Sequence, residues 1–147
     1  DEVSRANQQI IDIRSIKNNM RFILDKTEDN IELQEMINKY LDDISVVENN
    51  IHMTKNQSRQ DPLNFGIRIN NRIAFLLADS QRGDYPPTNQ SKEFFSQVKE
   101  ELDIEVTNLK AIIEKHSQKI EEYLKKNKID VISLKDWKLL TNWHIFN

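Results

Sequence analysis

The sequence predicts an all-α protein, an antiparallel up-and-down four-helix bundle followed by a short C-terminal tail. Both glycines and all three prolines of the 147-residue chain lie between Pro62 and Pro87. Because these residues are the strongest breakers of regular structure, long helix-permissive stretches remain on either side. In those stretches apolar residues recur at steps of three and four. The hydrophobic share of 37% and the charged share of 31% suit helices with one broad solvated face.

The N-terminal stretch predicts two helices, over residues 3–25 and 30–56. Between them Asp29 or Asn30 can accept hydrogen bonds from free backbone N–H groups, and Asp29 with Glu32 resembles a capping box. Two amphipathic helices joined by a short polar loop should pack antiparallel. The seam of the first helix is Val3, Ala6, Ile10, Ile13, Met20 and Leu24, with Ile16 substituting for Lys17. The seam of the second is Leu33, Ile37, Tyr40, Leu41, Ile44, Val47 and Ile51.

A third helix is expected over residues 62–81, with Asp61 as its cap and Pro62 at the first helical position. Gly66 weakens a helix interior, so we expect a close helix contact or a local bend there. Gly83 is well placed to end the helix. The expected apolar positions are Leu63, Ile67, Ile69, Ile73, Phe75, Leu76 and Leu77.

The fourth helix, over residues 88–127, is predicted to be the longest. The stiff turn of Tyr85, Pro86 and Pro87 precedes it, and Thr88 can cap it. At 1.5 Å per residue it runs to roughly 55 Å, against about 35 Å for the first helix, so part of it must overhang, bend or meet something else. Its apolar face consists of Phe95, Val98, Leu102, Val106, Leu109, Ile112, Ile113, Ile120, Tyr123 and Leu124. We interpret residues 1–132 as the bundle and 133–147 as the tail, whose pattern allows a short amphipathic helix.

Several classes of function lack support in the sequence. The net charge of −3 gives no field that would gather nucleic acid. No stretch reaches the roughly 18 apolar residues that membrane insertion requires. A carboxylate metal site of the bundle type needs Glu-x-x-His pairs, and His52, His116 and His144 lack a glutamate three residues before them. The serines lack a nucleophile elbow and a phosphate loop is absent, so we predict no catalytic, metal or cofactor-binding residues and no enzyme. The oligomeric state stays open.

Two groups of residues are candidates for something beyond packing. Asn70 and Asn71 lie where the third helix buries its apolar face, so at least one amide should sit near the seam. We favour bonds to the backbone of a neighbouring loop, which would fix register, over ligand binding, and expect either change to alanine to cost about 1 to 3 kcal/mol. The second group is a candidate docking surface, which could equally close one end of the bundle: Tyr85, Trp137, Trp143 and Phe146.

The segment 61–88 resembles a known family. Its order of Pro-Leu-Asn-Phe-Gly-Ile, Ile-Asn-Asn-Arg-Ile-Ala and Gly-Asp-Tyr-Pro-Pro-Thr is similar to the C-terminal helical region of bacterial BNR-repeat proteins, described as glycosyl hydrolases or sortilin-like β-propellers. The similarity covers most of residues 1–132 and does not include the tail. The residues that carry it are Asn64, Gly66, Asn70, Asn71, Gly83, Pro86, Pro87 and Thr88.

The resemblance implies a non-catalytic accessory domain whose partner is the propeller of the same parent chain or another protein. Any hydrolase chemistry would belong to the propeller, so no catalytic residue carries over. The resemblance also implies an extracytoplasmic parent protein. The alternative from another class is a small-ligand or glycan-binding domain, in which Trp137, Trp143 or Tyr85 stacks on a sugar face.

Overall fold

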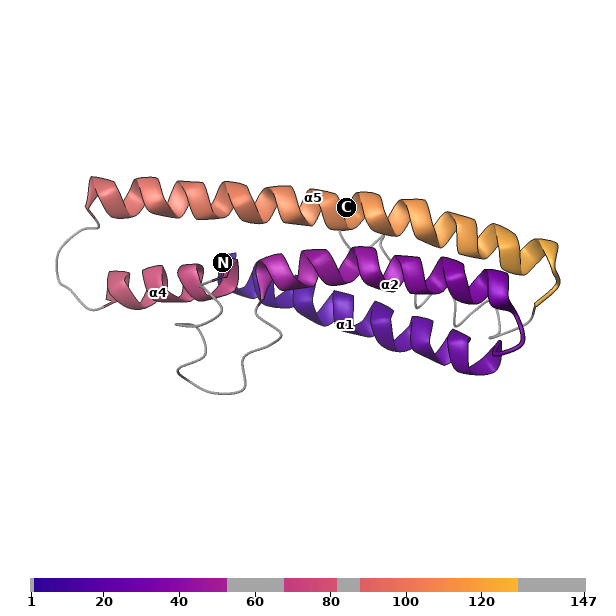
Figure 1. Cartoon of the computed structure of the whole chain (residues 1–147). Coiled ribbons are helices and arrows are strands. Elements are labelled where there is room, and N and C mark those ends of the chain that lie inside the picture. Colours follow the sequence, from indigo (N-terminus) through magenta and orange to yellow (C-terminus); the bar gives the residue numbers. More distant parts are fainter. Residues whose placement is uncertain (1, 53–67, 82–87, 130–147) are drawn as a thin grey trace. The chain divides into compact units, whose positions relative to one another are not determined.

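The computed structural model describes residues 2–52, 68–81 and 88–129 and shows an all-α four-helix bundle (Figure 1). The helices are α1 (Glu2–Lys26), α2 (Ile31–Ile51), α4 (Ile69–Gln81) and α5 (Asn89–Lys126). No strand occurs among the described residues, and no described helix is both long and apolar enough to cross a membrane. The predicted fold class is therefore confirmed.

The helix boundaries correct two of the predictions. The second helix was expected to reach residue 56, but α2 ends at Ile51 and His52 lies in a bend. A continuous third helix over 62–81 is wrong, because Arg68 is not helical and α4 begins at Ile69. The Arg68 carbonyl accepts the first helical hydrogen bond, from the Arg72 N–H at 3.0 Å, as a residue just before a helix does. Asp61, Pro62 and Gly66 lie outside the described residues.

The α1–α2 connection shows why α2 starts where it does. The side-chain Oδ1 of Asn30 accepts a hydrogen bond from the Leu33 N–H at 3.0 Å, so Asn30 rather than Asp29 is the cap. The same oxygen accepts a bond from the Tyr123 hydroxyl in α5, also at 3.0 Å. Gln34 Nε2 donates to the Glu28 carbonyl at 2.8 Å. These bonds satisfy polar groups that the chain reversal would otherwise leave unpaired.

The bundle consists of two compact units, and α1, α2 and α5 each contribute to both. One unit contains residues 12–44 of the first two helices together with α5 from Lys110 onward. Its buried apolar side chains follow the predicted seams, with Ile16 in place of Lys17 and Ile23 beside Leu24. They are Ile13, Ile16, Met20, Ile23, Leu33, Ile37, Tyr40, Ile44, Ile113 and Ile120. Five predicted residues of this unit are only half-buried: Leu24, Leu41, Ile112, Tyr123 and Leu124.

The other unit contains the start of α1, the end of α2, all of α4 and residues 89–109 of α5. Its buried apolar side chains are Ala6, Ile10, Val47, Ile51, Ile69, Ile73, Val98, Leu102, Val106 and Leu109. Three residues predicted for this core are instead exposed: Phe75 at 65%, Leu77 at 41% and Phe95 at 40%. These exceptions all lie in α4 and the first turns of α5.

Candidate functional site

Three of the residues selected from the sequence fall within the described part of the chain. Thr88 caps α5 as predicted, since its Oγ1 accepts the Ser91 N–H at 3.1 Å. Asn70 is half-buried and Asn71 is exposed. The other selected residues lie outside the described ranges: Asn64, Gly66, Gly83, Tyr85, Pro86, Pro87, Trp137, Trp143 and Phe146.

Among the described residues, the Asn70 side chain bonds a neighbouring helix, and its expected bond to loop backbone stays a prediction. Its Nδ2 donates to Oδ1 of Asn7 in α1 at 3.2 Å, and this bond is open to solvent. The expected cost of about 1 to 3 kcal/mol for losing this amide stays a prediction, and a bond that water can replace favours the lower end of that range. The Asn70 bond fixes α4 beside the first turns of α1.

The start of α1 is held against α5 as well as α4. Arg5 pairs with Asp103 at 2.5 Å and with Glu2 at 3.1 Å. These contacts place the first two turns of α1 beside Asp103, near the middle of α5. Toward its N-terminus α5 continues for about four more turns, alongside α4 (Figure 1).

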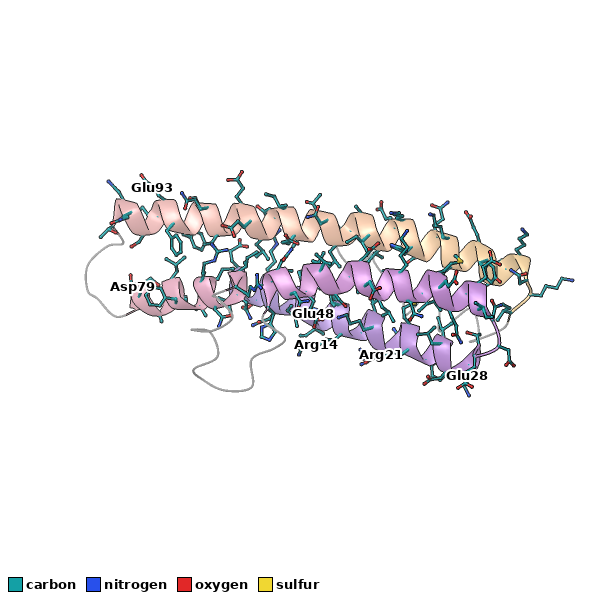
Figure 2. All side chains as sticks on the ribbon, in the orientation of Figure 1. Arg14, Arg21, Glu28, Glu48, Asp79 and Glu93 are labelled. Atoms are coloured by element: carbon teal, nitrogen blue, oxygen red, sulfur yellow. The ribbon has the colours of Figure 1, made fainter. Side chains whose placement is uncertain are left out.

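In this part the two helices form a hairpin whose apolar stripes pass from buried to exposed. On α4, Ile69 and Ile73 are 4% and 3% exposed, whereas Leu77, one turn further, is 41% exposed. On α5, Leu102 and Val98 are fully buried, whereas Phe95, one turn before Val98, is 40% exposed. Side chains fill the space between the two helices (Figure 2), but each stripe continues past the level of Arg5 in α1. The overhang expected from the length of the fourth helix is found here.

We define the hairpin face as Leu77 on α4 with Lys92, Phe95 and Lys99 on α5. Leu77 lies one heptad after Asn70, the residue that contacts α1, and so on the same side of α4. Lys92 precedes Asp103 by eleven residues, about three turns, and Lys99 precedes it by one turn. The four side chains are all exposed and follow the sides of α4 and α5 that α1 contacts further along the hairpin.

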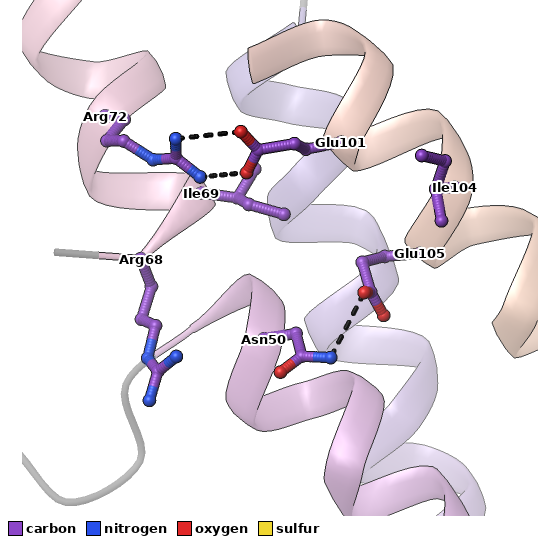
Figure 3. A pocket seen from close by; sticks show the side chains of 7 residues that line it. All are labelled: Asn50, Arg68, Ile69, Arg72, Glu101, Ile104 and Glu105. Atoms are coloured by element: carbon purple, nitrogen blue, oxygen red, sulfur yellow. Dashed lines mark hydrogen bonds and ion pairs between the residues drawn. The ribbon is translucent and has the colours of Figure 1, made fainter. Parts of the chain in front are cut away.

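A polar cavity of about 270 Å³ lies in the same unit (Figure 3), lined by Asn50, Arg68, Ile69, Arg72, Glu101, Ile104 and Glu105. Arg72 forms a bidentate ion pair with Glu101, in which Nη1 donates to Oε1 at 3.0 Å and Nη2 donates to Oε2. Asn50 Nδ2 donates to Glu105 Oε1 at 3.1 Å. Two arginines and two glutamates leave the lining without net charge. Within the described part of the chain, the buried Nε atoms of both arginines and Oε2 of Glu105 lack hydrogen-bond partners, and a hollow of this size can supply them with water.

His116 occupies a packing position in the other unit. Its ring is buried, stacks on Tyr40 with centroids 5.0 Å apart, and bonds through Nε2 to Asp43 at 2.7 Å. Burial raises the pKa of Tyr40 to about 12. With both rings closed off from solvent, neither side chain can reach a substrate.

A second hollow, of about 580 Å³, opens beside the α1–α2 connection and is lined mainly by that connection, with Tyr123 and Ile129. Two of the polar residues that line it, Asn30 and Tyr123, are engaged in the capping bonds described above. Among the described residues, no group of three or more histidine, aspartate or glutamate side chains could hold a metal ion.

Searches against models of known families, curated proteins and solved structures find no match to this chain. Sequence periodicity assigned Leu77 and Phe95 to the core and gave Lys92 and Lys99 no role. The signal that could have found the hairpin face was the excess length of the fourth helix.

Proposed function

We propose that this chain is a non-catalytic accessory domain that acts by helical packing against a protein partner. The observation that carries the proposal is the hairpin of α4 and α5, where the apolar stripe of each helix continues from buried residues to the exposed Leu77 and Phe95. Apolar side chains clustered on the surface of a folded domain are typical of sites that bind proteins.

The lack of a catalytic arrangement among the described residues also supports an interaction role. The cavity lined by Arg72 and Glu101 has its charges paired with one another, and His116 is packed against Tyr40. Neither place offers a nucleophile beside a general base.

We propose as partner a β-propeller of the same parent chain or another protein. The resemblance of the segment 61–88 to the helical region of BNR-repeat proteins supports this choice. Under this proposal the parent is an exported bacterial protein. The glycan-binding alternative depends on Tyr85, Trp137 and Trp143, which lie outside the described residues, so no structural observation favours it.

Site-specific photo-cross-linking tests the proposal. A benzophenone amino acid would replace Phe95 on the hairpin or, as a control, Phe22 on α1, which is 45% exposed and lies in the other unit. The parent protein would be irradiated in its own cell. We expect one defined adduct from position 95, absent from position 22. An adduct pattern identical at both positions, or no adduct at 95, would refute the proposed function.

A further inference from the structure

The hairpin face continues the surface of α4 and α5 that α1 covers elsewhere in the unit, so one further helix could pack on it. In the body of the unit, α1 contacts α4 through Asn7 and Asn70, and α5 through Arg5 and Asp103. Beyond the start of α1 the same sides of α4 and α5 continue with Leu77 and Phe95. A helix in line with α1 would place its apolar side chains over these two.

The side of α5 that faces α1 carries a negative charge beside α1 and positive charges beyond the start of α1. Where α1 packs against α5, Asp103 of α5 forms an ion pair with Arg5 of α1. Further along, α5 presents Lys99 and Lys92, which border Phe95 on the Asp103 side and are exposed. Neither lysine takes part in an ion pair among the described residues. A partner helix here therefore needs carboxylates where α1 has an arginine.

We infer that the hairpin face binds an amphipathic helix whose apolar stripe is bordered by acidic residues. The apolar stripe would cover Leu77 and Phe95, and two carboxylates one heptad apart would meet Lys92 and Lys99, which are themselves one heptad apart. This inference rests on the proposed function and specifies the chemistry of the partner. The charges set orientation and selectivity, while the apolar contact supplies most of the affinity.

Two synthetic helical peptides provide the direct test. Both carry leucine at the a and d positions of three heptads, and one has glutamate and the other lysine along the border of that stripe. Fluorescence anisotropy with the whole chain should give a Kd for the glutamate peptide at least about tenfold below that for the lysine peptide, with the difference shrinking at high salt. Equal binding of the two peptides, or no binding of either, overturns the inference.

Charge reversal on the protein provides the matched control. The double variant Lys92→Glu with Lys99→Glu should reverse the preference between the peptides. Lys110→Glu with Lys119→Glu changes the net charge of α5 equally at two exposed positions in the other unit and should leave the preference unchanged. Circular dichroism confirms that both variants are folded. A loss of preference in both pairs would show general attraction and would overturn the inference.

Apolar substitutions separate this face from the rest of the hairpin. Leu77→Ser and Phe95→Ser should each weaken binding of the glutamate peptide at least about fivefold, as for central contacts at an interface. Phe75→Ser is the control, because Phe75 lies on the opposite side of α4 from Ile73 and is 65% exposed. Sedimentation that shows dimers dependent on Leu77 would make a second copy the occupant and overturn the inference. The proposed function fails separately, through absent cross-links at position 95.

Discussion

Changing Leu77 to alanine should cost far less free energy of unfolding than changing Ile73 to alanine, although the two residues lie one turn apart on one apolar stripe. Ile73 is 3% exposed, and replacing a buried isoleucine by alanine costs about 2 to 5 kcal/mol through lost transfer energy and a new cavity. Leu77 is 41% exposed, so alanine forfeits only part of the roughly 1.5 to 3 kcal/mol that full burial supplies and leaves a notch that water fills. We expect about 1 kcal/mol for Leu77.

Urea unfolding followed by circular dichroism measures the free energy of unfolding of the unchanged chain and of the Leu77→Ala and Ile73→Ala variants. Similar m values in these three proteins would show that the comparison is valid. Alanine has high helix propensity, so neither change weakens α4 through the backbone. A cost for Leu77 equal to that for Ile73 would mean that the end of the stripe is buried in solution. The hairpin face would then not exist in the isolated chain, and the reasoning would be wrong.

Three further predictions concern other parts of the molecule. Burial raises the pKa of Tyr40 from 10.0 to about 12, so the folded state holds the phenol proton more tightly than the unfolded state does. The stability that this proton contributes is complete below pH 10 and is lost as the pH rises through 12. Tyr40→Phe should therefore remove on the order of 2 to 3 kcal/mol of the loss of stability at alkaline pH, measured by urea midpoints from pH 9 to 12. Asn30→Ala should cost about 0.5 to 2 kcal/mol in thermal unfolding, whereas Asp29→Ala, which is not the cap, should cost little. The coupling between Arg72 and Glu101 in a double-mutant cycle should be about 0.2 to 1 kcal/mol and fall in 1 M NaCl, since their side chains are 25% and 46% exposed; a value above 3 would contradict the account.

The sequence predicted the fold class and most of the core because helix periodicity records burial directly. It also predicted the cap at Thr88 and offered Asn30 as one of two candidates at the α1–α2 connection. The expectation that Ile16 and not Lys17 packs on the seam of the first helix is confirmed, since Ile16 is only 8% exposed. Each of these features depends on residues close together in the chain, where spacing is sufficient evidence.

The exposed stripe could not be predicted in the same way. A repeating apolar pattern shows which side of a helix faces a partner, but it does not show where along the helix that partner ends. Leu77 and Phe95 follow the same period as Ile73 and Leu102, and the positions of α1 and the end of α2 distinguish them. The position of α1 depends on contacts between distant residues, such as Arg5 with Asp103 and Asn7 with Asn70.

The boundary of α4 shows a second limit. Pro62 after Asp61 is a strong signal for a helix start, yet Arg68 is not helical and α4 starts at Ile69. The local start signal at Pro62 does not report that Arg68 is not helical or that its carbonyl accepts the first hydrogen bond of α4.

Thiol labelling tests the central claim, that the hairpin face is open in the free chain and covered by a partner helix. The chain contains no cysteine, so Leu77→Cys and Phe75→Cys each introduce a single reactive group. Both should label rapidly in the free chain. Saturating glutamate-bordered peptide should slow labelling at position 77 at least about tenfold and leave position 75 unchanged. Slow labelling at 77 in the free chain, or equal protection at both positions, would contradict the account.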